Sequence, residues 1–206
     1  MLSLLSERYP ERRYTGIDFS TKMLEAARAK GLKNVTLVRG DCEQLPFETD
    51  SFDAVICSQS FHHYPNPQAF FNSVFRVLRP GGRLILRDMT MSAPMAWIAN
   101  HLEMPLIHLL GHGDVRVYTC AEVRKLCENA GLTPETVQWR KGLRLHCVAR
   151  KPVGARPVFS LRSNPTRTPR RVGFFAYPAR FSAQKSSMQF SIIVRSQSTG
   201  IPAAIQ

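Results

Sequence analysis

The chain has 206 residues, which is enough for one domain of ordinary size and a tail. Its formal net charge of +13 suggests a nucleic-acid or other anionic partner, but the charge is unevenly distributed. All 15 acidic residues precede Thr136, and residues 151–206 contain nine basic residues and no acid. Residues 1–150 are therefore close to balanced, and this argues against a nucleic-acid-binding body.

Cysteine usage and hydropathy indicate a cytoplasmic protein without a membrane span. The five cysteines are scattered and form no Cys-x-x-Cys pair, as in a reduced protein without a zinc site. The amino terminus reaches Glu7 before any hydrophobic stretch of signal-peptide length. The apolar stretch 91–110 is interrupted by polar residues such as Asn100 and Glu103, so it does not read as a transmembrane helix.

The first 90 residues alternate between predicted helices and strands, as in a parallel α/β sheet. The helices are predicted from apolar residues at helical spacing, and the strands from short runs rich in β-branched residues or leucine. In chain order the predictions are a helix at 2–9, a strand at Tyr14–Ile17, a helix at Lys22–Lys30, strands at Val35–Val38 and Ala54–Cys57, a helix at Pro67–Leu78 and a strand at Leu84–Leu86.

The later elements complete the sheet. Met91–Gly113 is apolar and predicted to be helical, either as a wall for an apolar substrate or as a core-facing helix. Thr119 can cap a helix at Ala121–Ala130. Thr136–Arg140 and Leu143–Ala149 then read as an antiparallel pair of strands that turns at Lys141-Gly142.

Residues 151–206 differ in composition from the preceding part and are predicted to form a separate, disordered basic tail after a domain at 1–150. They are rich in Ser, Pro, Arg and Gln and show no sustained periodicity. Phe190–Arg195 could form a strand, but no glycine-rich loop or helix follows it. Contacts with RNA or anionic lipid would use the aromatic and basic residues Arg162, Arg167, Arg170, Arg171, Phe174 and Phe175.

Polar side chains follow the predicted strands at the points where ligands bind to open α/β sheets. Asp18 and Asp41 follow the first two strands, Ser58 and Gln59 the third, and Asp88 the fourth. A carboxylate in the position of Asp18 can accept two hydrogen bonds from a ribose diol. The alternative is an acid that stabilises the N-terminus of the following helix. The presence of Asp41 after the neighbouring strand favours a nucleoside site.

An ordered series of motifs resembles the class I S-adenosylmethionine-dependent methyltransferases. The resemblance covers roughly residues 1–150 and is greatest to the small-molecule branch that includes the ubiquinone and menaquinone biosynthesis enzymes. The motifs are Gly16–Ser20, Met23-Leu24, Ala26–Arg28, Gly40–Phe47, Ser51–Val55, His62-His63 and Arg76–Leu84.

The resemblance implies S-adenosylmethionine as cofactor and a small-molecule methyl acceptor. It places Asp18 on the ribose hydroxyls, Asp41 on the adenine amine and the backbone N–H of Cys42 on the adenine ring. Ser58 would line the methionine end. Phe19, in the same motif as Asp18, and Met23, in the next motif, are also assigned to the cofactor site.

The amino-terminal part departs from the family pattern. The family's first strand and glycine-rich loop precede its first helix, whereas this chain begins within that helix and has no glycine before Gly16. The fold expected is therefore a Rossmann-like, seven-stranded methyltransferase sheet that lacks its first strand and glycine-rich loop. We interpret the start as truncated or misassigned and expect weak cofactor binding or none.

Two functional hypotheses follow. The first is methyl transfer to a small, apolar-bodied molecule, for which His62 or His63 could act as a base or could simply pack or form hydrogen bonds under a lid. Because methyl transfer can proceed by in-line positioning, a base is not required. The alternative is a non-catalytic remnant scaffold whose basic tail binds nucleic acid or an anionic surface.

Overall fold

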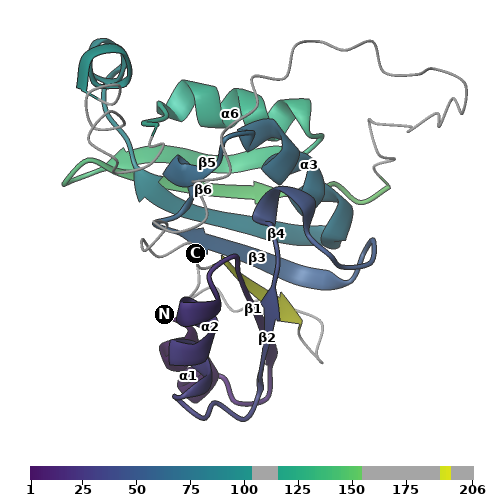
Figure 1. Cartoon of the computed structure of the whole chain (residues 1–206). Helices are drawn as coiled ribbons and strands as arrows, with labels where there is room; N and C mark the ends of the chain where they lie inside the picture. The colour runs from purple at the N-terminus through teal and green to yellow at the C-terminus, as the bar shows by residue number, and fades with distance from the viewer. Residues whose placement is uncertain (104–115, 155–190, 196–206) are drawn as a thin grey trace, which may run out of the picture.

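The computed structural model describes residues 1–103, 116–154 and 191–195, which form a mixed α/β sheet with helices on both faces (Figure 1). The strand order of the described sheet is β2-β1-β7-β3-β4-β6-β5. The strands are β1 (Arg13–Asp18), β2 (Val35–Arg39), β3 (Phe52–Ser58), β4 (Leu78–Met89), β5 (Thr133–Arg140), β6 (Arg144–Arg150) and β7 (Ser191–Arg195).

The described helices follow the predicted order. They are α1 (Leu2–Arg8), α2 (Thr21–Arg28), α3 (Pro67–Val77), α4 (Ala93–Ile98) and α6 (Cys120–Asn129), with the short helices η1 (Cys42–Gln44), η2 (Phe61–His63) and η3 (Ala99–Glu103). Local signals account for their starts, since the side chains of Ser20, Asn66 and Thr119 each accept a backbone hydrogen bond at a helix N-terminus. Of the predicted helix Met91–Gly113, residues 93–103 are helical and 104–115 lie outside the described residues.

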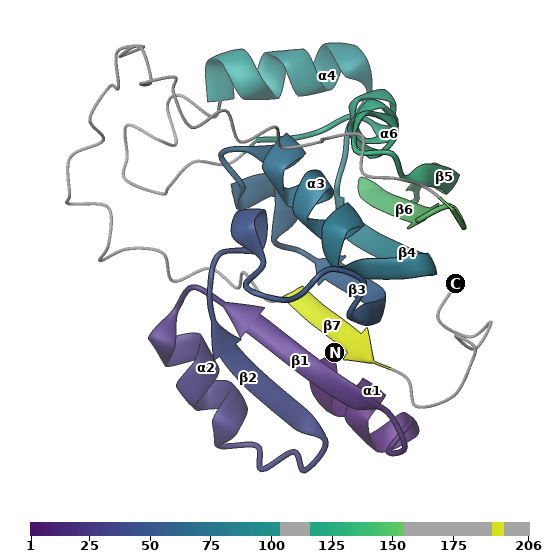
Figure 2. The same cartoon turned by 90° about the vertical axis from the view of Figure 1, so that its right-hand side faces the viewer.

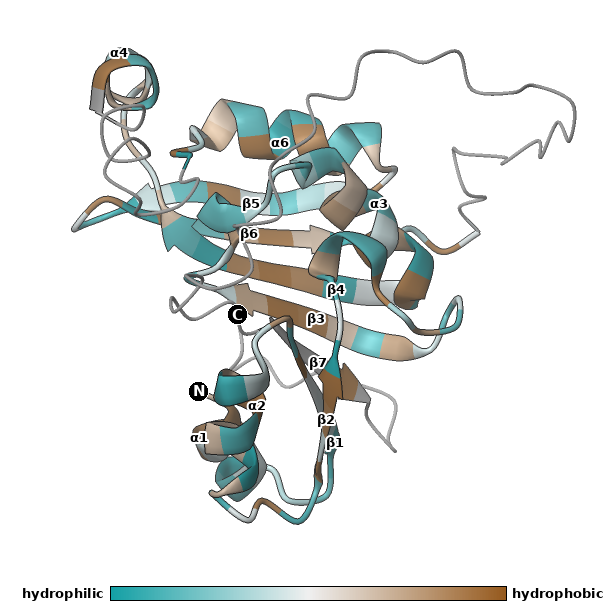
Figure 3. Cartoon of the chain, viewed as in Figure 1, coloured by the Kyte–Doolittle hydropathy of each residue, from teal (hydrophilic) through white to brown (hydrophobic). Residues whose placement is uncertain are grey.

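Successive residues of the central strands pack into two separate cores, one on each face of the sheet. Val55 and Cys57 of β3 belong to the larger core, in which the fully buried Phe70 and Phe71 of α3 also lie. Ala54 and Ile56 point the other way and pack with Leu2 of α1. Figure 3 shows hydrophobic residues along β3, β4 and β6. This alternation explains why the strands read as continuous apolar runs.

Strand β7 corrects the prediction of a sheet with a gap. It lies between β1 and β3 and pairs antiparallel with both, with Ser191 opposite Ile17 on one side and Cys57 on the other (Figure 2). By contrast, β1 pairs with β2 and β3 with β4 in parallel. The physical reason is that β1 and β3 each present a ladder of backbone groups, and one strand can satisfy both.

The prediction that the whole of residues 151–206 is disordered is therefore wrong for Ser191–Arg195. The side chain of Val194 is 3% exposed and packs in the core beneath α1. The RNA-contact candidates Arg162, Arg167, Arg170, Arg171, Phe174 and Phe175 lie outside the described residues.

Within residues 1–103, 116–154 and 191–195, no helix is both long enough and apolar enough to cross a membrane.

The burial of Val194 gives a direct test of the central position of β7. We expect Val194→Asp to lower the free energy of unfolding by about 2–4 kcal/mol, because it places a carboxylate in an apolar core without a partner. The measurement is urea unfolding followed by circular dichroism. The matched control is Val153→Asp at a site that is 84% exposed, where a change of no more than about 0.5 kcal/mol is expected. Equal losses in the two variants would contradict this placement of β7.

Candidate functional site

Asp18 is the last residue of β1, and one oxygen of its buried carboxylate has no hydrogen-bond partner among the described residues. Its side chain is almost fully buried, and Oδ1 accepts a 2.7 Å hydrogen bond from the backbone N–H of Ser20. Oδ2 is also buried, and no donor of the described residues reaches it. Burial raises the pKa of Asp18, and the hydrogen bond from Ser20 acts in the opposite direction. A ligand hydroxyl is the kind of group that would satisfy this oxygen.

Asp41 lies beyond the end of the neighbouring strand. It is exposed, and its Oδ1 accepts a 2.8 Å hydrogen bond from the backbone N–H of Glu43, which caps η1. The backbone N–H of Gly40 donates to the carbonyl oxygen of Asp18 over 3.2 Å and so ties the two strand ends together. A Cβ on Gly40 would lie 2.9 Å from Cδ1 of Ile17, so a larger residue here would have to displace the end of that side chain. The two carboxylates therefore follow adjacent strands at the same edge of the sheet.

The other residues assigned to the cofactor lie in two places. Phe19, Met23 and Cys42 follow β1 and β2, and Ser58 ends β3. Phe19 is 51% exposed, with the guanidinium of Arg39 lying 5.7 Å from its ring centroid. Met23 is half-buried in the first turn of α2, and Cys42 is buried in the larger core. Ser58 is half-buried at the end of β3, with β7 between it and the end of β1.

The direction of β7 determines which part of the chain lies between the ends of β1 and β3. A parallel strand would end here and lead into a helix, but β7 begins here, with Ser191 level with Ile17 and Cys57. Among the described residues, no glycine-rich strand-to-helix loop borders the site. The residues present thus fit the ribose of S-adenosylmethionine, through the unpartnered oxygen of Asp18. They do not supply the loop that the family uses for the methionine part.

His62, in η2, and Asp88, near the end of β4, form a buried pair. His62 Nδ1 lies 2.6 Å from Asp88 Oδ1, and the backbone N–H of His62 donates to Oδ2 over 3.3 Å. Asp88 is 1% exposed and also accepts a hydrogen bond from the backbone N–H of Met89. A carboxylate on Nδ1 keeps the ring proton there and leaves Nε2 as the basic nitrogen. The ring of half-buried His63 lies 4.0 Å from that of His62.

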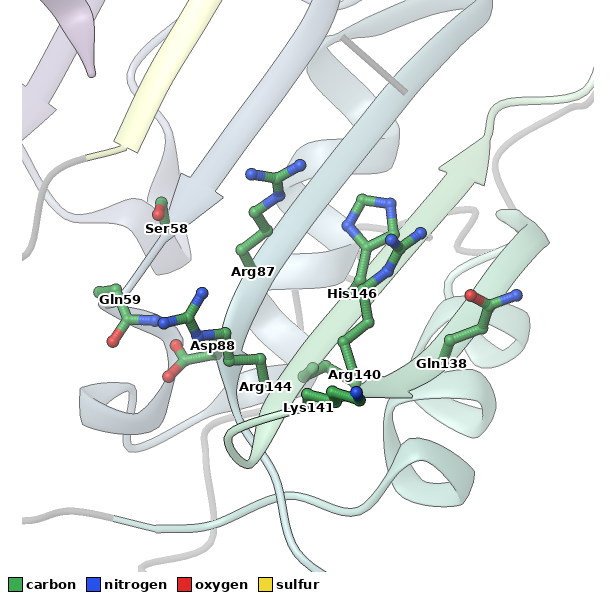
Figure 4. A pocket seen from close by; sticks show the side chains of 10 residues that line it. Ser58, Gln59, Arg87, Asp88, Gln138, Arg140, Lys141, Arg144 and His146 are labelled. Carbon is green, nitrogen blue, oxygen red and sulfur yellow. The ribbon is translucent and has the colours of Figure 1, made fainter.

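A cavity of about 890 Å³ opens beside Ser58 and Asp88, at the carboxyl ends of β3 and β4 and the β5–β6 hairpin (Figure 4). Its lining contains three arginines, one lysine and one histidine, and Asp88 is the one acidic residue among them. The full lining is Ser58, Gln59, Arg87, Asp88, Gln138, Arg140, Lys141, Arg144, Leu145 and His146.

Sequence reasoning singled out Asp88 of β4 but missed the other residues that β4, β5 and β6 contribute to this cavity. A signal was present in the alternation of Arg144–Arg150, where Leu145, Cys147 and Ala149 pack in the larger core and Arg144 and His146 face the other side. Only the pairing of β4 with β6 brings Arg87 opposite His146.

His146 is the second buried polar group in this region without a partner. It is 5% exposed, and its Nδ1 has no hydrogen-bond partner among the described residues. Burial lowers its pKa, and the positive charges of Arg87 and Arg140 lower it further. The imidazole is therefore neutral at neutral pH.

Within the described part of the chain, no group of three or more His, Cys, Asp or Glu side chains is arranged to hold a metal ion.

The sequence is similar to those of known methyltransferases. Residues 1–86 match a family described as a methyltransferase domain. The chain is 41% identical over 98 residues to phthiotriol/phenolphthiotriol dimycocerosates methyltransferase 1 of Mycobacterium ulcerans, covering 47% of this chain and 36% of that protein. It is 33% identical over 129 residues to 27-O-demethylrifamycin SV methyltransferase of Amycolatopsis mediterranei, covering 60% of this chain and 47% of that protein. The chain thus spans less than half the length of these curated relatives.

The fold is similar to that of solved methyltransferases. An S-adenosylmethionine-dependent methyltransferase from Mesorhizobium loti superimposes with a TM-score of 0.57 at 21% identity, over 66% of this chain and 79% of that chain. Residues 1–86 are thus similar to a methyltransferase domain, and the described α/β sheet has the fold of a solved S-adenosylmethionine-dependent methyltransferase.

Proposed function

We propose that this chain binds the adenosine of S-adenosylmethionine at the ends of β1 and β2 and serves methyl transfer to a small molecule with an apolar body. The observation that carries the proposal is the buried Oδ2 of Asp18, which lacks a donor among the described residues at the place where a ribose hydroxyl would supply one. The family match of residues 1–86 supports the same cofactor.

The residue roles in this proposal are those that the family resemblance implies. Asp18 accepts hydrogen bonds from the ribose hydroxyls, and exposed Asp41 accepts one from the adenine amine. The backbone N–H of Cys42 meets the adenine ring, with Phe19 and Met23 beside the nucleoside. When bound, the cofactor supplies a sulfonium methyl group. The chain's contribution to rate is to align an acceptor atom behind that methyl, with Ser58 at the methionine end.

An apolar acceptor is supported by the segment that follows β4. Met95, Trp97 and Ile98 of α4 and Leu102 of η3 are each 49–65% exposed. The relatives with matching sequence are named for phthiotriol dimycocerosates and for a demethylrifamycin, which are both small molecules rather than proteins or nucleic acids. A segment of this kind can form one wall of an apolar site.

A general base is available if the acceptor needs one. Asp88 holds the Nδ1 proton of His62, so that Nε2 can accept a proton from a hydroxyl or an enol. The pair is also compatible with a purely structural role, since Asp88 satisfies the backbone N–H of His62 as well. We assign His62 as the candidate base ahead of His63 because of this orientation.

Binding of S-adenosylhomocysteine tests the adenosine site directly. Isothermal titration of the full chain should show weak binding, because the described residues include no glycine-rich loop. Asp18→Ala should weaken that binding by about tenfold or more, since a hydrogen bond to a charged group contributes about 1.5–3 kcal/mol. Asp41→Ala should weaken it to a smaller extent, because Asp41 is exposed.

The matched control is Glu25→Ala, which removes one exposed carboxylate from α2 without touching either strand end. Its affinity should stay within about twofold of the wild-type value, because exposed charges contribute little. Unchanged affinity in both aspartate variants would contradict the site assignment, and no binding to the wild-type chain would contradict the proposed function.

The pH dependence of the same binding provides a second test. Burial raises the pKa of Asp18 above its usual 3.8, so the carboxylate loses its charge at a higher pH than an exposed one. Affinity for S-adenosylhomocysteine should fall as pH decreases through this raised pKa, since protonation removes an acceptor. Asp18→Asn should show no such step. For the free protein the sign is opposite, because burial of the ionised form lowers stability as pH rises through the same value.

A further inference from the structure

Five polar side chains share one face of the sheet around the cavity beside β3 and β4. Strand register places Arg87 of β4 directly opposite His146 of β6, and His146 opposite Gln138 of β5. Two residues further on, Arg144 lies opposite Arg140. Because side chains alternate along a strand, all five project from the same face. We call the cavity they line with Lys141 the basic pocket (Figure 4).

Among the described residues, the cations of the basic pocket lack acidic partners, whereas the arginines at the opposite ends of the same strands have them. In the described ranges, no ion pair joins Arg87, Arg140, Lys141 or Arg144 to a carboxylate. At the opposite end of the same strands, the arginines are neutralised. Arg83 and Arg150 share Glu135, and Arg79 pairs with Asp53.

The register of the hairpin adds to this imbalance. Like charges placed directly opposite each other in an antiparallel pair lower stability, and Arg140 and Arg144 are such a pair. The one acid in the lining, Asp88, accepts hydrogen bonds from His62 and from the backbone of Met89. The pocket therefore carries a net positive charge, because four cations face this one carboxylate, which is already hydrogen-bonded to His62 in η2.

His146 marks the inner wall of the pocket. It lines the cavity, is 5% exposed, and its Nδ1 is buried without a partner among the described residues. A neutral imidazole can carry its single proton on Nδ1 and donate it to a ligand oxygen. An oxygen that lay between His146 and the facing Arg87 would satisfy this nitrogen and neutralise a cation at the same time.

We propose that the basic pocket binds an oxyanion, a carboxylate or a phosphate group, carried by the methyl acceptor. The pocket volume of about 890 Å³ suits a small organic molecule. Arginine side chains fit both groups because their planar forks donate paired hydrogen bonds to two oxygens. The acceptor would then have an anionic group held by Arg87, Arg144 and His146 and an apolar body directed to α4.

The identity of the bound molecule as methyl acceptor rests on the proposed function, but oxyanion binding by the pocket does not. The probes are benzoate and phenyl phosphate, which share an aromatic body and differ in the oxyanion. Isothermal titration of the full chain in low salt should show binding of at least one of them, and that probe identifies the oxyanion. Its affinity should decrease as sodium chloride is added.

The variant Arg87→Gln/Arg144→Gln should weaken the preferred probe by about tenfold or more, since it removes two charge-assisted contacts. The matched control is Arg124→Gln/Lys125→Gln, which removes the same charge from exposed positions on α6 and should leave affinity within about twofold. Melting temperatures are followed by circular dichroism. The control variant should match the wild type, and the pocket variant should match or exceed it, because Arg144→Gln removes the like-charge pair with Arg140. His146→Phe, which keeps an aromatic ring but no donor, should also weaken the probe.

Three results would overturn the proposal. They are the absence of binding of either probe, equal weakening in the pocket variant and the α6 control, and preferential binding of a single-stranded RNA that depends on Arg87 and Arg144.

S-adenosylhomocysteine titration of the same variants separates this proposal from the proposed function. If that ligand binds and neither probe does, the basic pocket is not an oxyanion site and the cofactor assignment stands. If a probe binds and S-adenosylhomocysteine does not, the oxyanion site stands and the methyltransferase proposal fails.

Discussion

The fold depends on hydrogen-bond pairing along the facing edges of β1 and β3. Strand β7 pairs with both edges at once, opposite Arg13–Ile17 on one side and Ala54–Cys57 on the other. Without a strand at this position, the sheet would separate into a β1–β2 pair and the β3–β4–β6–β5 group, each with an open edge. The buried Val194 joins the core of β1 and β3 beneath α1, so hydrophobic packing adds to the backbone pairing.

The direction of β7 shapes the site as much as its position does. Because the strand runs antiparallel to its neighbours, it enters the sheet at the edge where β1 and β3 end. The chemistry of that edge is consequently divided. Carboxylates that suit a nucleoside lie at the end of β1 and beyond β2, at Asp18 and Asp41, and cations that suit an oxyanion lie near the end of β4 and in the β5–β6 hairpin. This division separates the cofactor end of the proposed reaction from the acceptor end.

Buried polar atoms without hydrogen-bond partners are the most informative feature of both proposed binding sites. Such atoms are uncommon in folded proteins because each costs free energy of desolvation. Of the three among the described residues, Oδ2 of Asp18 and Nδ1 of His146 lie at the two proposed binding positions, and the third is Nε of Arg83, which is ion-paired with Glu135. Under the proposed function, a ribose hydroxyl of the cofactor would satisfy Oδ2 of Asp18. The position of His146 points to the chemistry of the acceptor.

The sequence by itself determined the local elements and the resemblance to the methyltransferases. Capping residues such as Ser20 and Thr119, and apolar spacing in α3, are short-range signals, and the motifs from Gly16 to Leu84 resemble those of the methyltransferases without reference to a structure. The tertiary structure alone decided that β7 fills the centre of the sheet, and that Arg87, Arg144 and His146 meet in one pocket. These contacts join residues far apart in the chain. A five-residue strand carries no local signal for its partner or direction, because register and direction are set by the edges that are free to pair.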